Sequence, residues 1–321
     1  MFARSISILR RTVTNWSDDG ASNWAAALAF YTMLSVGPLL FVAVAIAGLV
    51  FGQDVASGAI LEQMSNLMGD EAAQAVGRMM QEAATPKRGL LATAMGIATL
   101  LFGATGVFAA LQDAINGLWH VRPKPDAGVV VWIKKRFLSM SMVLGLGFLL
   151  MVSLVLNGLM AALWQQTAGM PTSQLLRVGE FVSSWALGGM LMAGIFKVLP
   201  DAHIPWRSAL VGAATTTVLL NIGKAAIGLY LGRSGIGDAF GAAGSLALVL
   251  LWVYYAAQVL FLGAAFTRVF SQDVGAQIRP DPDAVAVETV PVREKHKPAK
   301  AARAPGKPAH KDRQSHEKTV H

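Results

Sequence analysis

The sequence contains no cysteine among its 321 residues, and charged residues make up only 14% of it. Without cysteine the chain has no disulfide framework, no thiolate nucleophile and no cysteine-ligated metal or iron–sulfur site. An ordinary soluble domain carries about 25% charged residues. Here hydrophobic residues make up 54% of the chain, and the mean hydropathy is +0.49. The composition therefore indicates a membrane protein.

The formal net charge of +8 does not indicate nucleic-acid binding once it is located along the chain. Residues 268–321 hold eleven Lys and Arg against seven Asp and Glu, which is half of the excess. Residues 271–321 are rich in Pro, Ala and basic groups, so we expect a disordered, basic cytoplasmic tail. Its expected partner is anionic lipid at the membrane surface, with no nucleic acid. Binding of a protein partner by this tail stays open.

Six apolar segments are long enough to cross a bilayer, since a helical span needs about 20 residues. They cover approximately residues 26–51, 90–111, 137–164, 178–199, 208–231 and 242–266. We therefore predict an all-α membrane protein, with a bundle of six transmembrane helices over residues 25–270. Residues 1–24 would form a cytoplasmic or interfacial segment.

The polar connection between the first two spans is predicted to be an amphipathic helical segment on the outer side. It places five apolar residues at helical spacing: Ile60, Leu61, Met64, Leu67 and Met68. Such a segment either lies on the bilayer or caps the bundle. Lys and Arg gather in the N-terminal segment and in the second and fourth connections. The positive-inside rule then places both termini in the cytoplasm of a multi-pass inner-membrane protein.

The first span contains two helix breakers, Gly37 and Pro38, at its centre. Ending the helix at Pro38 would leave only 13 residues, 39–51, which is too short to cross alone. The helix must therefore run through the break and kink there. Hydroxyl groups before the break predict a polar patch that faces protein or water. A functional hinge and a simple packing irregularity both stay open.

Polar groups within the spans predict a cleft between helices. In the fifth span, Thr217, Asn221 and Lys224 share one helix face, which should point into the bundle. Lys224 is expected to pair with Glu180 or, failing that, Asp238; snorkelling to the outer interface is the alternative. The complete predicted cleft consists of Tyr31, Thr32, Ser35, Pro38, Glu180, Thr217, Asn221, Lys224, Tyr255 and Gln258.

A second polar group is expected at the cytoplasmic span ends. It consists of Gln112, Asp113, Asn116, Lys197 and Arg207. The first three follow the second span and could meet the two cations, which flank Leu199 and Pro200. Helix capping and ion-pair closure of the bundle end explain such residues, so no catalytic role is predicted for them.

Four stretches resemble one known family. They are "AAALAFYTMLSVGPLL", "LQDAINGLW", "LPDAHIPWRSALVGA" and "SLALVLLWVYYAAQVLFLGAAFT", and they occur in family order and spacing. They are similar to the YihY/BrkB family of bacterial inner-membrane proteins, once labelled ribonuclease BN. The resemblance implies a six-span helical membrane protein with a suspected role in transport or envelope lipids. Where the family usually has Gly-Ala-Glu-Phe-Thr, this chain has Ala265 in place of the glutamate.

Two functions stay open from sequence: transport of a lipid or other amphiphile through a polar cleft, and a non-enzymatic scaffold. The scaffold would bind partners through its tail and outer helices, and a homo-oligomer is compatible with either function. We expect no enzymatic activity, because His120 and His203 are the two histidines outside the tail and neither has a matched carboxylate cluster. No phosphate-binding Gly-rich loop occurs. No cofactor and no metal are therefore expected.

Overall fold

The computed structural model describes residues 2–51, 57–58, 60–62, 64–65, 70–83, 106–124, 173–234 and 242–287. These residues are mostly helical, as predicted, and they include four short strands. Residues 1–287 form one compact unit. The third predicted span, 137–164, lies outside the described residues, and the second is described only from residue 106.

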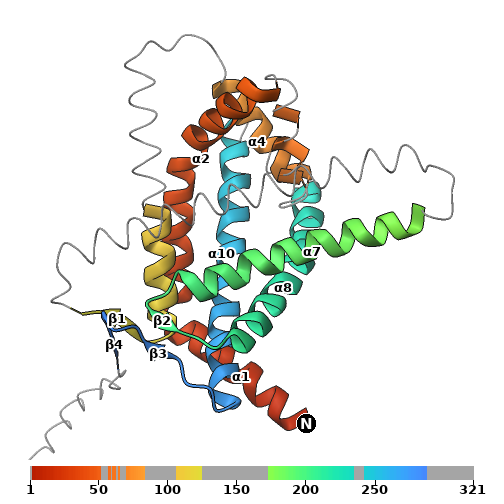
Figure 1. Cartoon of the computed structure of the whole chain (residues 1–321). Coiled ribbons are helices and arrows are strands. Elements are labelled where there is room, and N and C mark those ends of the chain that lie inside the picture. Colours follow the sequence, from red (N-terminus) through yellow and green to blue (C-terminus); the bar gives the residue numbers. More distant parts are fainter. Residues whose placement is uncertain are drawn as a thin grey trace, which may run out of the picture. The chain divides into compact units, whose positions relative to one another are not determined.

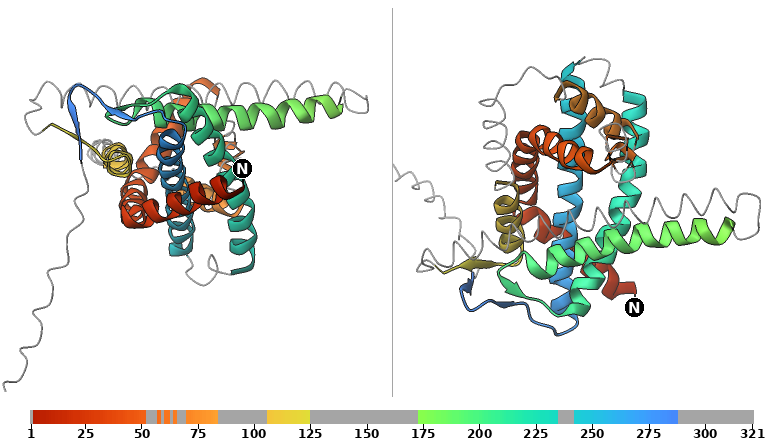
Figure 2. Two further views of the ribbon diagram at one scale, coloured as in Figure 1. Left: turned by 90° about the horizontal axis from the view of Figure 1, so that it is seen from below. Right: turned by 45° about the horizontal axis from the view of Figure 1, so that its top comes forward.

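Three long helices dominate the described part (Figure 1). They are α2 (Ala21–Phe51), α8 (Trp206–Ser234) and α10 (Ala242–Asp273), with 31, 29 and 32 residues. At 1.5 Å per residue each is about 45 Å long, which exceeds the roughly 30 Å hydrocarbon core of a bilayer. α10 contacts both α2 and α8 and lies between them in Figures 1 and 2.

Two helical segments in the described part are long and apolar enough to span a membrane: Trp206–Ile227, with 22 residues, and Leu246–Asp273, with 28 residues. They correspond to the fifth and sixth predicted spans. The fourth predicted span lies in α7 (Ser173–Val198), whose apolar part, Trp185–Val198, is shorter. α7 packs against α8 and crosses it (Figure 2).

The first predicted span forms one continuous helix, α2, that includes Gly37 and Pro38. The helix therefore runs through the break, as the span-length argument requires. α2 starts five residues earlier than expected, at Ala21. The side chain of Pro38 lies outside the described residues.

Glycines allow α8 and α10 to approach each other closely. A Cβ atom on Gly212 of α8 would overlap Thr267 of α10, and a Cβ atom on Gly263 of α10 would overlap Thr216 of α8. Each threonine hydroxyl donates to the glycine carbonyl four residues earlier in its own helix, at 2.8 Å for Thr216 and 2.7 Å for Thr267. The two Gly-x-x-x-Thr pairs thus interlock without leaving a hydroxyl unsatisfied.

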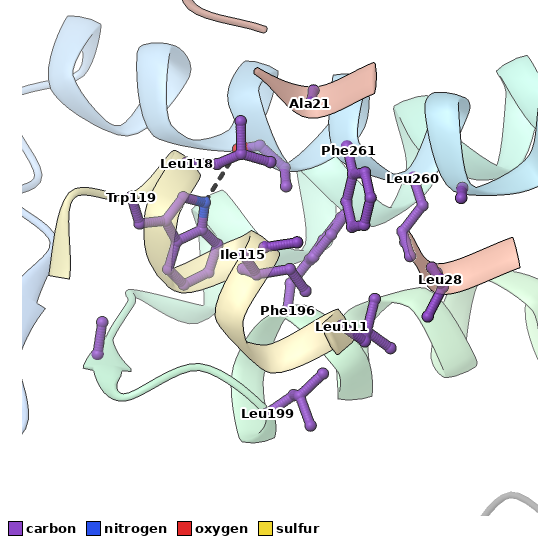
Figure 3. Close-up of a cluster of buried hydrophobic side chains, with 14 of the residues drawn as sticks. Ala21, Leu28, Leu111, Ile115, Leu118, Trp119, Phe196, Leu199, Leu260 and Phe261 are labelled. Atoms are coloured by element: carbon purple, nitrogen blue, oxygen red, sulfur yellow. Dashed lines mark hydrogen bonds between the residues drawn. The ribbon is translucent and has the colours of Figure 1, made fainter. Parts of the chain in front are cut away.

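The main hydrophobic core lies where α2, the helix over residues 106–118, α7 and α10 meet (Figure 3). Its largest fully buried side chains include Phe196, Phe261 and Ile115. Trp119 adds a tilted ring contact to Phe196, with ring centroids 6.5 Å apart. The core therefore joins the described end of the second predicted span to the last one.

The amphipathic connection caps the helices at the opposite end of α10. Helix α4 (Asp70–Ala83) contacts α2, α8 and α10. Its Val76 and Met80 form a small core with Leu248 and Val249, near the start of α10. Ile60, Leu61 and Met64 pack against this core, whereas Leu67 and Met68 lie outside the described residues. Of the two arrangements expected from sequence, the structure thus shows the cap.

Short strands join the segment after α10 to two other connections. β1 (Val121–Pro123) pairs antiparallel with β4 (Ala284–Ala286), and β2 (Ala202–His203) pairs antiparallel with β3 (Arg279–Pro280). We call residues 274–287 the strap. The prediction that residues 271–321 are disordered is therefore wrong for 271–287, and 288–321 lie outside the described residues. Composition missed the strap because backbone bonds to distant segments, rather than apolar burial, hold most of it in place.

Candidate functional site

Four segments that are distant in the sequence meet at one end of the helices. They are the turn between α1 (Phe2–Asp18) and α2, the connection after residue 118, the connection after α7, and the strap. The sequence predicted that these segments share the cytoplasmic side. These segments meet at one end of the helices and α4 lies at the other end. This arrangement agrees with successive helices that cross the membrane in alternating directions.

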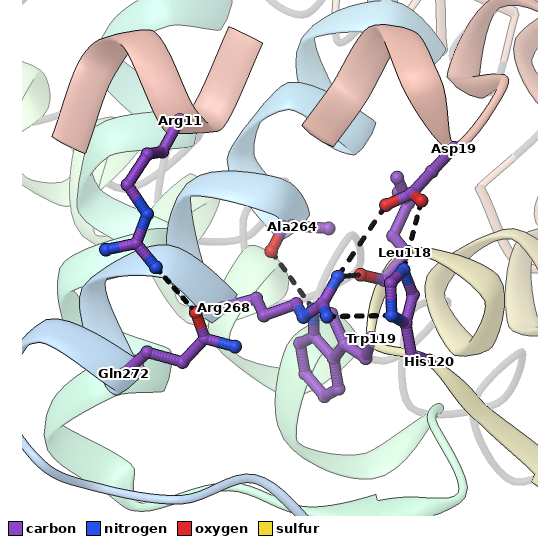
Figure 4. Close-up of polar contacts among 8 residues, drawn as sticks. All are labelled: Arg11, Asp19, Leu118, Trp119, His120, Ala264, Arg268 and Gln272. Carbon is purple, nitrogen blue, oxygen red and sulfur yellow. Dashed lines mark hydrogen bonds and ion pairs between the residues drawn. The ribbon is translucent and has the colours of Figure 1, made fainter. Parts of the chain in front are cut away.

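An ionic network links three of these segments (Figure 4). His120 Nε2 lies 3.0 Å from Asp19 Oδ1, and Arg268 Nη2 lies 2.8 Å from His120 Nδ1. Arg268 Nη1 also donates to the Leu118 carbonyl at 3.0 Å and lies 3.7 Å from Asp19 Oδ2. The side chains of Asp19, His120 and Arg268 are each at least three-quarters buried. The network therefore ties the start of α2 to the end of α10.

The contacts determine which nitrogen of His120 carries the proton. A guanidinium group can only donate, so Nδ1 of His120 must accept from Arg268. Nε2 is then free to carry the hydrogen and donate to the Asp19 carboxylate. The backbone of His120 has φ of 55°, a left-handed conformation that ends the preceding helix. Val287 of the strap donates to the His120 carbonyl at 2.8 Å.

A second network, made of amide groups around the Asp201 carboxylate, joins the same helix to the turn after α7. Asp201 accepts from Gln112 at 3.1 Å and from Asn116 at 2.8 Å, and its own N–H donates to Asn116 at 2.9 Å. The strap adds a bond from the Asp281 N–H to the Asp201 carbonyl at 3.0 Å. The sequence placed Gln112 and Asn116 near this turn but did not include Asp201.

The remaining members of the predicted cytoplasmic group lie at the same end. Lys197 donates to the Ile204 carbonyl at 2.5 Å, and its ammonium is 5.5 Å from the centre of the Trp206 ring. Asp113 and Arg207 are exposed there. Capping of helix ends and closure of the bundle account for these contacts. Among the described residues, no three His, Asp or Glu side chains are grouped so that they could hold a metal ion.

The predicted mid-span cleft residues lie on four helices: α2, α7, α8 and α10. Four of their described polar residues bond within their own helix: Thr32 to Leu28 at 2.8 Å, Ser35 to Thr32 at 3.0 Å, Thr217 to Ala213 at 2.9 Å, and Asn221 to Thr217 at 2.8 Å. α10 lies between α2 and α8 (Figure 1). The polar residues of α2 and α8 therefore lie on helices that flank α10.

Tyrosines fill the closest helix contacts of this region. The hydroxyl of Tyr255 lies 3.3 Å from the Leu219 carbonyl of α8, against Gly223, where a Cβ atom would overlap it. Tyr31 of α2 packs on Gly106, where a Cβ atom would lie 2.5 Å from the tyrosine ring. Lys224 is half-buried, and the side chain of its predicted partner Glu180 lies outside the described residues. The predicted pair therefore stays a prediction.

Gln258 differs from the other predicted cleft residues. Its Oε1 is buried and has no hydrogen-bond partner among the described residues. It lies in the apolar segment Leu246–Asp273 of α10, one turn after Tyr254 and Tyr255. A buried amide oxygen without a donor is unfavourable by about 1–3 kcal/mol. Of the predicted cleft, this atom offers the clearest site for a hydrogen-bond donor from outside the protein.

Position 265 is completely enclosed. Ala265 is buried, as is Ala264, whose carbonyl accepts from Nε1 of Trp119 at 3.0 Å. The family's usual glutamate would place a carboxylate at this point of α10. Here a methyl group occupies it, and the nearest ionic network instead uses Arg268, one turn later.

Sequence reasoning missed Asp19, Asp201 and Arg268, and it assigned His120 no partner. Each of the four lies just before or after an apolar segment or close to its end. Charges in such positions are usually interpreted as topology signals or solvated caps. A signal was nevertheless present: Arg268 falls within one turn of the apolar end of the last span, where an unpaired cation is costly.

The comparisons with known proteins agree with the resemblance noted in the sequence. The family model described as "Virulence factor BrkB" matches residues 12–288. The chain belongs to the BrkB family. This match covers nearly all of the compact unit, including the strap, and stops one residue after it.

Curated relatives of this BrkB-family chain are named "UPF0761 membrane protein". The one from Chromobacterium violaceum is 28% identical over 256 residues, covering 77% of this chain and 58% of its own length. Those from Alkalilimnicola ehrlichii and Pseudomonas paraeruginosa are each 26% identical, covering 77% and 82% of this chain and 54% and 62% of their own. The chain thus spans little more than half of these relatives. No solved structure matches it.

Proposed function

We propose that this membrane protein binds a lipid or another amphiphile beside α10 and moves it across the bilayer. The observation that carries the proposal is the buried Oε1 of Gln258 in an apolar helix, which has no hydrogen-bond partner among the described residues. Polar groups inside a membrane are costly and mark ligand pathways when they have no structural partner. A hydroxyl or ammonium donor on a lipid headgroup would satisfy this oxygen.

The helices around Gln258 support such a role. Tyr254 and Tyr255 lie one turn away on α10 and provide rings with a polar end. Thr32 of α2 and Thr217 and Asn221 of α8, the helices that flank α10, bond within their own helices, so they can line a passage without needing a ligand to satisfy them. Among the described residues of the predicted cleft, Gln258 is therefore the one expected to respond most strongly to whether the site is occupied.

The same proposal includes six membrane spans in the bacterial inner membrane. The fifth and sixth are the two apolar segments Trp206–Ile227 and Leu246–Asp273. The end that carries the strap and the ionic network would face the cytoplasm, because the basic connections meet there. The proposed activity is transport without covalent chemistry, and it uses no cofactor.

Reconstitution into vesicles tests this function. Full-length protein in vesicles of phosphatidylethanolamine and phosphatidylglycerol would be assayed for transfer of headgroup-labelled lipid between leaflets. Replacement of Gln258 by Leu should lower the rate about tenfold, the equivalent of one lost hydrogen bond of about 1.4 kcal/mol. The matched control is Gln272→Leu, the same change outside the proposed site, where Gln272 accepts from Arg11 on the exposed surface at 2.9 Å.

Two results would contradict the proposal. One is the absence of transfer by the wild-type protein for every labelled lipid and amphiphile tried. The other is equal transfer by Gln258→Leu and Gln272→Leu. A chain shortened by deletion of residues 288–321 provides a further comparison: a transporter keeps its flux, whereas a scaffold that uses its tail loses its partner.

A further inference from the structure

The helix α1 has three different faces. One face packs on the protein and includes Thr12, which is only 3% exposed. A second, apolar face is open: Ile6 and Leu9 are each 60% exposed and Val13 is 53% exposed. The spacing i, i+3, i+7 puts these three side chains in one stripe along the helix. The third face is polar and exposed and carries Ser7, Arg10 and Thr14.

α1 is fastened to the end of α10, so its apolar stripe cannot turn inward. Arg4 Nε donates to the Asp273 carboxylate at 2.7 Å, and Arg4 Nη2 donates to the Asp273 carbonyl at 3.0 Å. Arg11 donates to Gln272 at 2.9 Å. Gly20, with φ of 69°, makes the sharp turn that leads into α2. α1 consequently runs across the end of the helices rather than along them (Figure 2).

We propose that α1 is a membrane-surface helix whose stripe of Ile6, Leu9 and Val13 is immersed in the headgroup and acyl boundary beside the bundle. Two observations select lipid as the occupant. First, Arg10 borders the stripe on the exposed side, where it can meet anionic headgroups. Second, the stripe is close along the chain to Phe30 and Leu34, the exposed apolar residues of the adjoining helix α2, which the bilayer must cover.

The geometry of three faces fits a helix lying in the membrane plane against a protein. One side contacts the bundle, one faces lipid and one faces water. Such helices bury their apolar side about 5–10 Å into the headgroup and acyl boundary. This inference does not depend on any transport activity, because it concerns where α1 lies and not what α10 binds. It gives the strap end of the protein a fixed depth in the leaflet.

The chain has no cysteine, so single cysteines report cleanly on each face of α1. Full-length Leu9→Cys and Val13→Cys would be labelled with an environment-sensitive nitrobenzoxadiazole dye and reconstituted into phosphatidylethanolamine and phosphatidylglycerol vesicles. Ser7→Cys and Thr14→Cys are the matched controls on the polar face. All four positions are exposed, so the substitutions disturb no buried packing.

The expected result is blue-shifted emission at positions 9 and 13, with strong quenching by lipids brominated on the acyl chain. Labels at positions 7 and 14 should emit as in water and resist that quenching. A blue shift at 9 and 13 without quenching would mean that protein covers the stripe, through a second copy or another segment, and would overturn the proposal. Water-like emission at all four positions would also overturn it.

Discussion

The α8–α10 interface and the strap end of the molecule satisfy their polar groups in opposite ways. Between α8 and α10, the threonine hydroxyls bond to carbonyls of their own helix, and glycines on the facing helix provide the space. At the strap end, carboxylates, amides and a histidine bond across segments that are about 80 to 150 residues apart. The α8–α10 interface is therefore stabilised by shape complementarity, whereas the strap end is stabilised by specific hydrogen-bond partners.

The largest expected effect comes from overfilling the interface. Replacement of Gly263 by Leu puts side-chain atoms where Thr216 now lies, and even the Thr216 Cβ, which is fixed to the α8 backbone, would be only 2.9 Å from the new Cβ. Overpacking typically costs about 1–3 kcal/mol and more where nothing can move, so we expect a loss of at least about 3 kcal/mol. The measurement is thermal unfolding and monodispersity of the purified protein in detergent.

Gly194→Leu is the control for this change, since nothing lies within 4 Å of a Cβ atom on Gly194 of α7. It should unfold close to the wild-type temperature. Gly263→Ala combined with Thr216→Ala should recover part of the loss, because it removes the overlapping hydroxyl. Equal stability of Gly263→Leu and Gly194→Leu would show that the close approach is not needed.

A smaller effect is expected from breaking the ionic network. Arg268→Met keeps the length of the side chain but removes the cation that faces Asp19 and His120. Loss of one partner from a buried pair costs about 3–5 kcal/mol, and partial exposure of these groups lowers our expectation to about 2 kcal/mol. Unfolding of the membrane protein in detergent provides the measurement.

Arg4→Met is the matched control, because it removes an ion pair to Asp273 whose arginine is 65% exposed. An exposed pair contributes only about 0–1 kcal/mol. Arg268→Met should therefore destabilise the protein clearly more than Arg4→Met does. If the two variants unfold alike, the network does not hold the ends of α2 and α10 together.

The smallest expected effect concerns the amide network around Asp201. Asn116→Ala removes two bonds to Asp201, at 2.8 and 2.9 Å, and leaves the bond from Gln112. With about 1 kcal/mol for each bond, the expected loss is about 1–2 kcal/mol. Hydrogen exchange of the strap should rise at the same time, since Asp281 bonds to the Asp201 backbone. Unchanged hydrogen exchange in the strap would show that the bonds between Asn116 and Asp201 do not stabilise the strap.

Much of the helical architecture could be predicted from the sequence. The continuous helix through Gly37 and Pro38 followed from the length of apolar sequence that a bilayer requires, and the structure confirms it. The positions of the fifth and sixth spans followed from the same argument. These features are local, because an apolar run of sufficient length favours a membrane-spanning helix whatever lies beside it.

The candidate site was less predictable. Gln258 could be selected from the sequence alone, because a polar side chain within an apolar helical segment is recognisable without the tertiary structure. Whether its Oε1 finds a hydrogen-bond partner, however, depends on which helices surround it, and none is found in the described part of the chain. The predicted cleft combined residues of α2, α7, α8 and α10, and only the structure shows that α10 lies between α2 and α8 (Figure 1). Helix periodicity assigns a face to each residue but does not say which helix that face meets.

By itself, then, the sequence determined a membrane protein of the BrkB family, the approximate extent of its apolar helices and an amphipathic helical segment between the first two. Each of these depends on hydrophobicity and spacing along one stretch of chain. The tertiary structure alone decided that Asp19 meets His120 and Arg268, that glycines of α8 and α10 receive each other's threonines, and that residues after Asp273 continue as a strap. Those contacts join distant segments, and only the folded chain brings their hydrogen-bond donors and acceptors together.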